Sequence, residues 1–281
     1  MRRIGNFFLS IFPTLVILIL GFAVTLVMTS IYVIQTGGSL SDITAVLMGT
    51  SDLLAYPQMT NLIYGIFGIL IFGVWFRRSN KRSSKKEKQA PSIRGFSFHT
   101  VMAILFLAIG LQYVSTLATD VVRWIAPDLV SDYNSMMQSG YGTVTLLVAV
   151  YTVILSPILE ELVFRGLTLR YARRAFPFWI ANIWQALLFG LVHMNLVQGI
   201  YAFIIGMILG YICYKGGGIR YTILIHIIFN LIGVYFSSLI DLTLAFNEPI
   251  VLACGLALTI FAIWLFATDF TPDRRQREDI R

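Results

Sequence analysis

The sequence predicts an all-α polytopic membrane protein, a helical bundle of about eight transmembrane helices. The chain of 281 residues is 57% hydrophobic, only 12% of its residues are charged, and its mean hydropathy is +0.79. A soluble domain could not cover its surface with so few charges. The apolar residues also form long runs, each close to the roughly 20 residues that a membrane helix needs. Inside a bilayer the backbone groups must be paired within helices.

Eight apolar runs are candidate spans, near residues 7–35, 60–76, 99–119, 143–164, 178–195, 197–214, 219–238 and 249–267. The first run follows Arg2 and Arg3, as a signal peptide would. It is too long, however, and lacks a cleavage site between small residues, so we expect it to remain as an anchor. Residues 120–142 mix charges with Trp124 and prolines, and we expect them to lie along the outer interface.

The distribution of Lys and Arg predicts the orientation. With the N-terminus in the cytoplasm and eight crossings, 20 of the 21 Lys and Arg residues face the cytoplasm, and Arg123 alone lies outside. This asymmetry is what the positive-inside rule requires. We therefore expect a multi-pass protein of the cell membrane with both termini in the cytoplasm. The net charge of +7 reflects these loops and does not indicate nucleic-acid binding.

A basic stretch divides the chain. Residues 77–94 contain eight Lys or Arg residues and one glutamate, which indicates a cytoplasmic linker in contact with anionic lipids. Residues 1–76 then form an N-terminal two-helix membrane segment. Residues 95–268 form a six-helix core that holds every candidate site residue, and residues 269–281 form a charged cytoplasmic tail.

The run from Glu160 to Arg165 (EELVFR) places two acids and an arginine in an apolar helix. An ionisable side chain inside a bilayer costs at least about 2–3 kcal/mol, so it needs partners and indicates a function. Glu161 and Arg165 are four residues apart and can pair on one helix face. Glu160 points about 100° away and can face a site as a general base. The alternative is a salt-bridge cluster at a helix end.

Two of the three histidines lie on separate apolar runs, His193 in FxxxH and His226 in HxxxN. His226 and Asn230 share one helix face, and the amide can hold a developing oxyanion. Interhelical hydrogen bonds are the alternative for both. His193 can act as a metal ligand or proton donor. Two histidines and Glu160 could hold zinc, but a glutamate-activated water fits the same residues.

The depth of His193 depends on where its helix begins. At about 1.5 Å per residue, Glu160 and His226 share a depth toward the cytoplasm. His193, counted from a span that starts at residue 178, lies nearer the outer side. It joins the site if that span begins later, or if the fifth and sixth helices are short and tilted.

In this order the motifs EExxFRG (160–166), FxxxH (189–193) and HxxxN (226–230) resemble the CAAX-protease and bacteriocin-processing family, also called the Abi family. The KGGGI stretch at 215–219 is similar too, and the resemblance covers roughly residues 143–235. It implies an intramembrane peptidase whose first glutamate activates water, assisted by the two histidines. By the same resemblance Asn230 stabilises the oxyanion, and Glu161 and Arg165 support the geometry.

The resemblance also bears on substrates. Eukaryotic members remove the C-terminal tripeptide of prenylated proteins, whereas bacterial members are linked to peptide maturation, bacteriocin immunity and surface-protein regulation. This short chain with its compact linker resembles the bacterial members, so we expect a membrane-associated peptide or protein as substrate, without a prenyl group. The alternatives are a non-catalytic immunity or peptide-binding protein of the same fold, and a proton-coupled transporter, which an internal repeat would favour.

Overall fold

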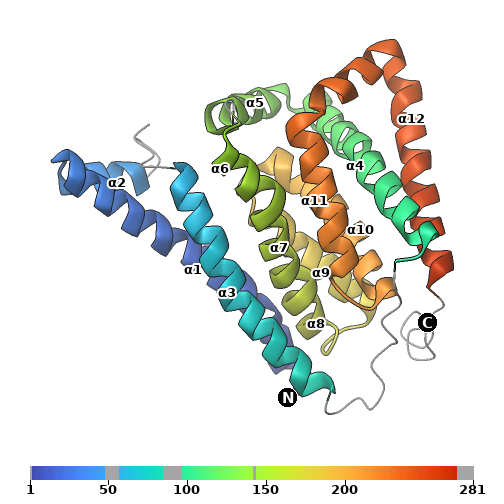
Figure 1. Ribbon diagram of the computed structural model, residues 1–281, viewed down its shortest axis with the longest axis horizontal. Coiled ribbons are helices and arrows are strands. Elements are labelled where there is room, and N and C mark those ends of the chain that lie inside the picture. The colour runs from blue at the N-terminus through green and yellow to red at the C-terminus, as the bar shows by residue number, and fades with distance from the viewer. Residues whose placement is uncertain (1, 48–56, 85–95, 142–143, 271–281) are drawn as a thin grey trace.

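The computed structural model describes residues 2–47, 57–84, 96–141 and 144–270, and within these ranges the secondary structure is helical, with no strand. Figure 1 shows long helices that run side by side, with the start of the first helix (from Arg2) and the end of the last (at Asp269) toward the same end of the bundle. The predicted all-α polytopic bundle is therefore confirmed.

Each of the eight apolar runs is helical. They become α1 (Arg2–Thr36), α3 (Pro57–Ser84), α4 (Phe98–Ile125), a composite helix over Leu146–Ala172, α9 (Phe178–Leu191), α10 (Leu196–Gly216), α11 (Arg220–Tyr235) and α12 (Ser237–Asp269). Six of them are long and apolar enough to cross a membrane. The other two, α9 and α11, have 14 and 16 residues and are shorter than a full span.

Local features explain where the short helices end. After α9 the chain turns through Met194, which has a left-handed φ of 53°, and Asn195 then caps α10 with its side chain. After α11 the chain leaves helical geometry at Phe236 and enters α12, which is kinked at Asn247 ahead of Pro249. Two further helices, α2 (Leu40–Leu47) and α5 (Pro127–Tyr141), lie at the end of the bundle away from the termini (Figure 1).

The composite helix leaves the α-helical hydrogen-bond register twice. Two π-helical segments, η1 (Val150–Leu155) and η2 (Leu162–Thr168), alternate with the α-helical segments α6 (Leu146–Ala149), α7 (Ser156–Glu161) and α8 (Leu169–Ala172). In η1 the backbone N–H of Ser156 bonds to the oxygen of Tyr151, five residues back. The two glutamates therefore lie on a short α-helical segment between two wider turns, an arrangement frequently found at functional sites.

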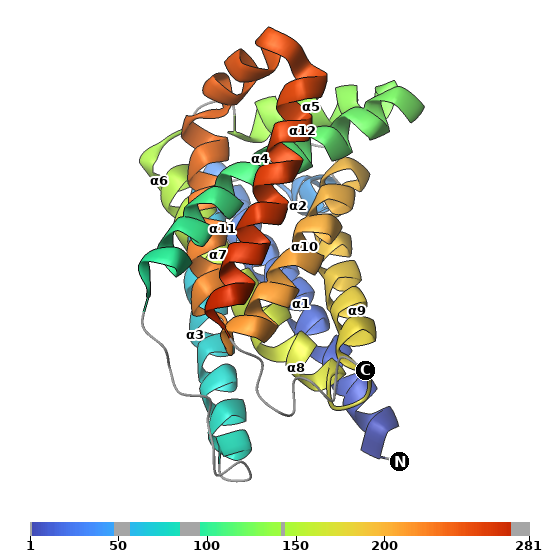
Figure 2. The same ribbon diagram turned by 90° about the vertical axis from the view of Figure 1, so that its right-hand side faces the viewer.

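Helices α9 and α10 approach each other along a line of small residues. Figure 2 shows them as neighbours. A Cβ on Gly190 would lie 2.6 Å from the carbonyl oxygen of Gly199, and a Cβ on Gly206 would lie 3.1 Å from the Cβ of Ala186. A Cβ on Gly210 would lie 1.8 Å from Oδ1 of Asn182. Glycine is required wherever a neighbouring helix comes this close.

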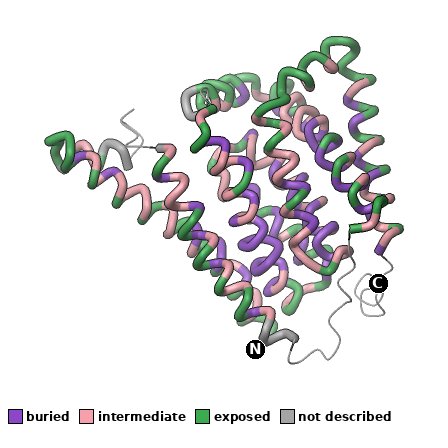
Figure 3. The backbone as a smooth tube through the Cα atoms, in the orientation of Figure 1, coloured by how far each residue is buried: buried purple, intermediate pink, exposed green. Residues whose placement is uncertain are grey.

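The N-terminal pair α1 and α3 packs against the composite helix. Phe72 of α3 is fully buried beside Leu159, and Gly68 admits the Leu159 side chain, because an added Cβ would lie 2.7 Å from it. Figure 3 shows that the outer parts of α1 and α3 are largely exposed, whereas burial concentrates where they meet the core. In the predicted linker 77–94, residues 77–84 continue α3. Residues 85–94, and 271–281 of the predicted tail, lie outside the described residues.

Candidate active site

Glu161 and Arg165 form a buried ion pair on the composite helix. Nη1 of Arg165 lies 2.8 Å from Oε1 of Glu161, and both side chains are 0% exposed. The guanidinium also stacks on the Phe189 ring, 4.3 Å from its centroid, and its second terminal nitrogen points at the Gly206 carbonyl at 3.5 Å. Removing one partner of such a pair would leave the other as an uncompensated charge in the interior. The pairing predicted from the four-residue spacing is present.

His226 lies between the two glutamates. Its Nδ1 is 3.0 Å from Oε1 of Glu161, and its Nε2 is 3.6 Å from Oε2 of Glu160. An ionised carboxylate can only accept a hydrogen bond, so Nδ1 is the donor to Glu161. In the neutral imidazole Nε2 then carries a lone pair and faces Glu160. Glu161 thus fixes both the orientation and the tautomer of His226.

Glu160 is the more accessible of the two acids. Its side chain is 19% exposed, against 0% for Glu161. The Ser156 hydroxyl donates to Oε1 of Glu160, which leaves Oε2 facing the imidazole. Ser156 was absent from the sequence-derived site, although its position four residues before Glu160 places it on the same helix face. From α3, Tyr64 lies close enough to Glu160 to interact electrostatically.

His193 lies in the turn that follows α9, and Phe189 joins it to the rest of the site. The helix begins at Phe178, where the residue count placed it, but it is short, whereas α10 has 21 residues. The His193 ring packs 5.0 Å from the Phe189 centroid, and the His226 ring packs 6.1 Å from the same centroid. Nδ1 of His193 bonds to the Phe189 carbonyl at 2.8 Å, so Nε2 again carries the lone pair.

The two histidines nevertheless share no polar partner among the described residues. Among the described residues, no hydrogen bond or ion pair joins His193 to Glu160, Glu161 or His226, and no three His, Cys, Asp or Glu side chains are arranged to hold a metal ion. In the part of the chain that the structure describes, Glu160, His193 and His226 therefore do not fit the three-ligand zinc set.

Asn230 has a backbone partner. Its Nδ2 donates to the carbonyl oxygen of Thr152 in η1 over 2.8 Å. This bond joins α11 to the composite helix one turn beyond His226. The sequence suggested that Asn230 could hold an oxyanion, and it gave no sign that a carbonyl of η1 would need a donor.

A second polar cluster on α9 shares a backbone acceptor with Arg165. Nε2 of Gln185 donates to the Gly206 carbonyl at 2.9 Å, the same oxygen that Arg165 approaches, and also to Oδ1 of Asn182. Both amide side chains are fully buried on α9. Sequence reasoning missed this cluster, because its signal was two amides three residues apart in an apolar helix, which packing alone also explains.

Comparison with known families identifies the segment that carries these residues. Residues 142–232 match a family model described as type II CAAX prenyl endopeptidase Rce1-like. The match covers about a third of the chain and contains all three motifs. It confirms the resemblance to the CAAX proteases and the assignment of the chain as a peptidase of that type. Neither the curated proteins nor the solved structures contain a match.

Proposed function

Residues 142–232 match the type II CAAX prenyl endopeptidase family, and on this premise we propose that Glu160 activates a water molecule to cleave a peptide bond within the bilayer. The observation that carries the proposal is the position of His226. Its Nε2 lies 3.6 Å from the Glu160 carboxylate, beyond a direct hydrogen bond. A water molecule beside the pair can donate one hydrogen to Glu160 and the other to Nε2.

The chemical steps follow from this geometry. Glu160 takes a proton from the water, and the water oxygen attacks the scissile carbonyl carbon to form a tetrahedral intermediate. Glu160 then returns the proton to the amide nitrogen as the C–N bond breaks and the amine leaves. Glu161 holds His226 in the tautomer that presents Nε2 to the water. The His193 ring also packs against Phe189 and has a lone pair on its Nε2, and we propose that it assists by contacting the substrate.

We propose an unprenylated substrate, either a membrane-associated peptide or a segment of a membrane protein, as in the bacterial roles of peptide maturation, immunity and surface-protein regulation. The membrane association of this substrate is supported by Glu160, which is partly accessible but lies within a long apolar helix. The matched family is described as a prenyl endopeptidase. The test therefore includes a farnesylated peptide ending in a CAAX sequence and the same peptide without the lipid.

The experiment compares purified wild type, Glu160→Gln and His226→Ala in nanodiscs against a quenched-peptide library and the two CAAX peptides, with products read by mass spectrometry. We expect Glu160→Gln to lower kcat/KM by about 10²–10⁴-fold, the usual contribution of a general base. Glu248→Gln is the matched control, because Glu248 is an exposed glutamate away from the site. This variant should cleave the peptides as wild type does.

Three outcomes would contradict parts of the proposal. Full activity of Glu160→Gln would remove the catalytic role of that residue. Cleavage confined to the farnesylated peptide would reverse the substrate assignment. Tight peptide binding by wild type and Glu160→Gln alike, without products, would favour a non-catalytic peptide-binding or immunity protein. A parallel incubation with a chelator tests metal dependence independently of these variants.

A further inference from the structure

The site contains a backbone carbonyl that the helix itself leaves without a donor. In an α-helix the oxygen of Thr152 would accept from the N–H of Ser156. Here that N–H bonds to Tyr151 instead, because η1 follows the π register. In the π register the donor to Thr152 would be residue 157, which is a proline and has no N–H. Neither register therefore supplies Thr152 with a backbone partner.

Asn230 supplies the missing donor. Its Nδ2 lies 2.8 Å from the Thr152 oxygen, which is a full hydrogen bond from a different helix. An unpaired carbonyl in hydrocarbon is strongly unfavourable, so a side chain that pairs with it is held firmly in place. Pro157 thus creates the need for a donor, and the Asn230 amide meets it.

The bond also fixes the active residues relative to each other. Asn230 lies one turn after His226 on α11, and Pro157 lies three residues before Glu160 on α7. The bond therefore sets the axial position of His226 against the two glutamates, where its nitrogens lie 3.0 Å and 3.6 Å from their carboxylates. A shift of one ångström along α11 would be enough to break this alignment.

From these contacts we infer that Asn230 is a positioning residue, which acts through the Thr152 carbonyl that Pro157 leaves free. We define Pro157, the Thr152 carbonyl and Asn230 as the proline latch. The inference rests on the proposed peptidase function, and it differs from the expectation that Asn230 donates to the oxyanion of the substrate. It assigns Pro157 a role that no motif of the sequence suggested.

The test is a rescue. In Asn230→Ala the Thr152 oxygen loses its donor, and we expect kcat/KM to fall about 10- to 100-fold, the effect of leaving a buried polar group unpaired. Pro157→Ala restores a backbone N–H to the helix, and in either register Thr152 then gains a donor. The double variant should recover at least about tenfold over Asn230→Ala. Pro157→Ala should also raise the melting temperature of Asn230→Ala about 5 °C more than it raises that of wild type.

Two controls separate the latch from a general gain in helix stability. Pro157→Ala combined with His226→Ala should recover no activity, because the lost imidazole has no connection with the carbonyl. If Asn230→Ala fails to fold, recovery of folded protein in the double variant supports the latch, and failure of both variants overturns it.

The remaining outcomes are also decisive. A double variant as inactive as Asn230→Ala overturns the positioning role and favours donation to the substrate, whatever its melting temperature. Should wild type cleave none of the peptides, the proposed function fails by itself. In that case the melting temperatures alone test the latch. A larger effect of Pro157→Ala in Asn230→Ala than in wild type supports it, and equal effects refute it.

Discussion

At the scale of single residues, one aromatic ring contacts the arginine and both histidines of the site. The Phe189 side chain is buried and contacts the Arg165 guanidinium, the His193 and His226 imidazoles and the Phe164 ring. Arg165 suits this place because a guanidinium can stack on a ring while it donates in plane to Glu161. Phe189 therefore holds the polar groups in position, and Phe164 packs against its ring.

Replacement of Arg165 by methionine tests the buried ion pair. The substitution leaves the Glu161 carboxylate in the interior without its cation, and we expect the free energy of unfolding to fall by about 3–5 kcal/mol. Thermal unfolding in detergent measures this loss. Arg123→Met is the matched control, since Arg123 pairs with Asp120 at an exposed site where a salt bridge contributes at most about 1 kcal/mol. Equal losses in both variants would contradict the argument.

At the scale of helices, small residues decide how closely elements approach. On α9 and α10 the glycines leave room for a neighbouring backbone and for buried amides, and the Gly206 carbonyl receives both Gln185 and Arg165. The α9–α10 contact is therefore connected to the ion pair, and through it to His226.

An alanine at position 210 should separate these helices. Its Cβ would lie 1.8 Å from Oδ1 of Asn182, so the amide must move and its bond to the Met207 carbonyl must change. We expect a loss of about 1–3 kcal/mol, typical of overpacking, measured by thermal unfolding. Gly73→Ala on α3 should be neutral or stabilising, because a Cβ there meets nothing within 4 Å. Addition of Asn182→Ala should relieve much of the loss, and purely additive effects would refute the clash.

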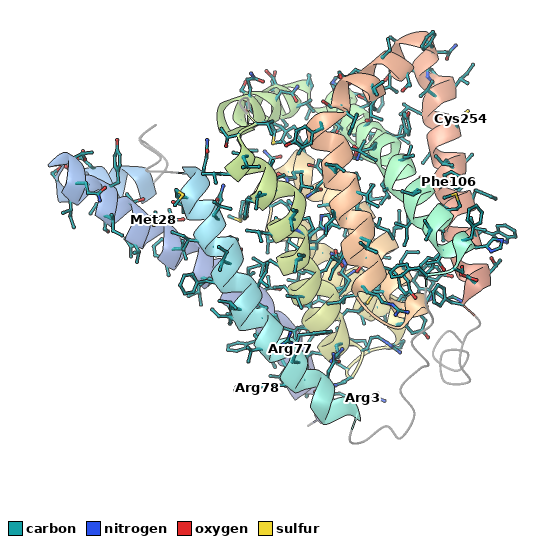
Figure 4. All side chains as sticks on the ribbon, viewed as in Figure 1. Arg3, Met28, Arg77, Arg78, Phe106 and Cys254 are labelled. Atoms are coloured by element: carbon teal, nitrogen blue, oxygen red, sulfur yellow. The ribbon has the colours of Figure 1, made fainter. Side chains whose placement is uncertain are left out.

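At the scale of the whole molecule, the positive charges gather at one end of the bundle. Figure 4 shows Arg3 of α1 and Arg77 and Arg78 of α3 near the end that carries the N-terminus, and Figure 1 places the C-terminal end of α12 toward the same side. Helix α5 lies across the other end. This arrangement supports a multi-pass protein, and we propose that the basic end faces the cytoplasm and contacts anionic lipids.

Cysteine labelling tests this orientation. In a background with Cys213→Ala and Cys254→Ser, we expect Asn134→Cys on α5 to react with a membrane-impermeant maleimide in intact cells, because the side chain is exposed at the outer end. Ser92→Cys in the linker should react only after the membrane is permeabilised. The reverse pattern would invert the proposed topology, and the site would then open toward the opposite half of the bilayer.

The sequence alone predicted the fold class, the Glu161–Arg165 pair and the resemblance to a family. Apolar runs in a bilayer must be helical, so the fold class followed from composition and run length. The four-residue spacings predicted the Glu161–Arg165 pair, because they act within one helix. The order of EExxFRG, FxxxH and HxxxN indicated the family, which the match over residues 142–232 confirms.

Only the tertiary structure decided which groups meet across helices. The contact of His226 with both glutamates, the placement of His193 on Phe189, and the bond from Asn230 to Thr152 each join segments far apart in the sequence. They depend on the short length of α9 and on the π register around Pro157. Helical periodicity describes one helix at a time, whereas these contacts arise from where each helix ends and how closely its neighbours pack.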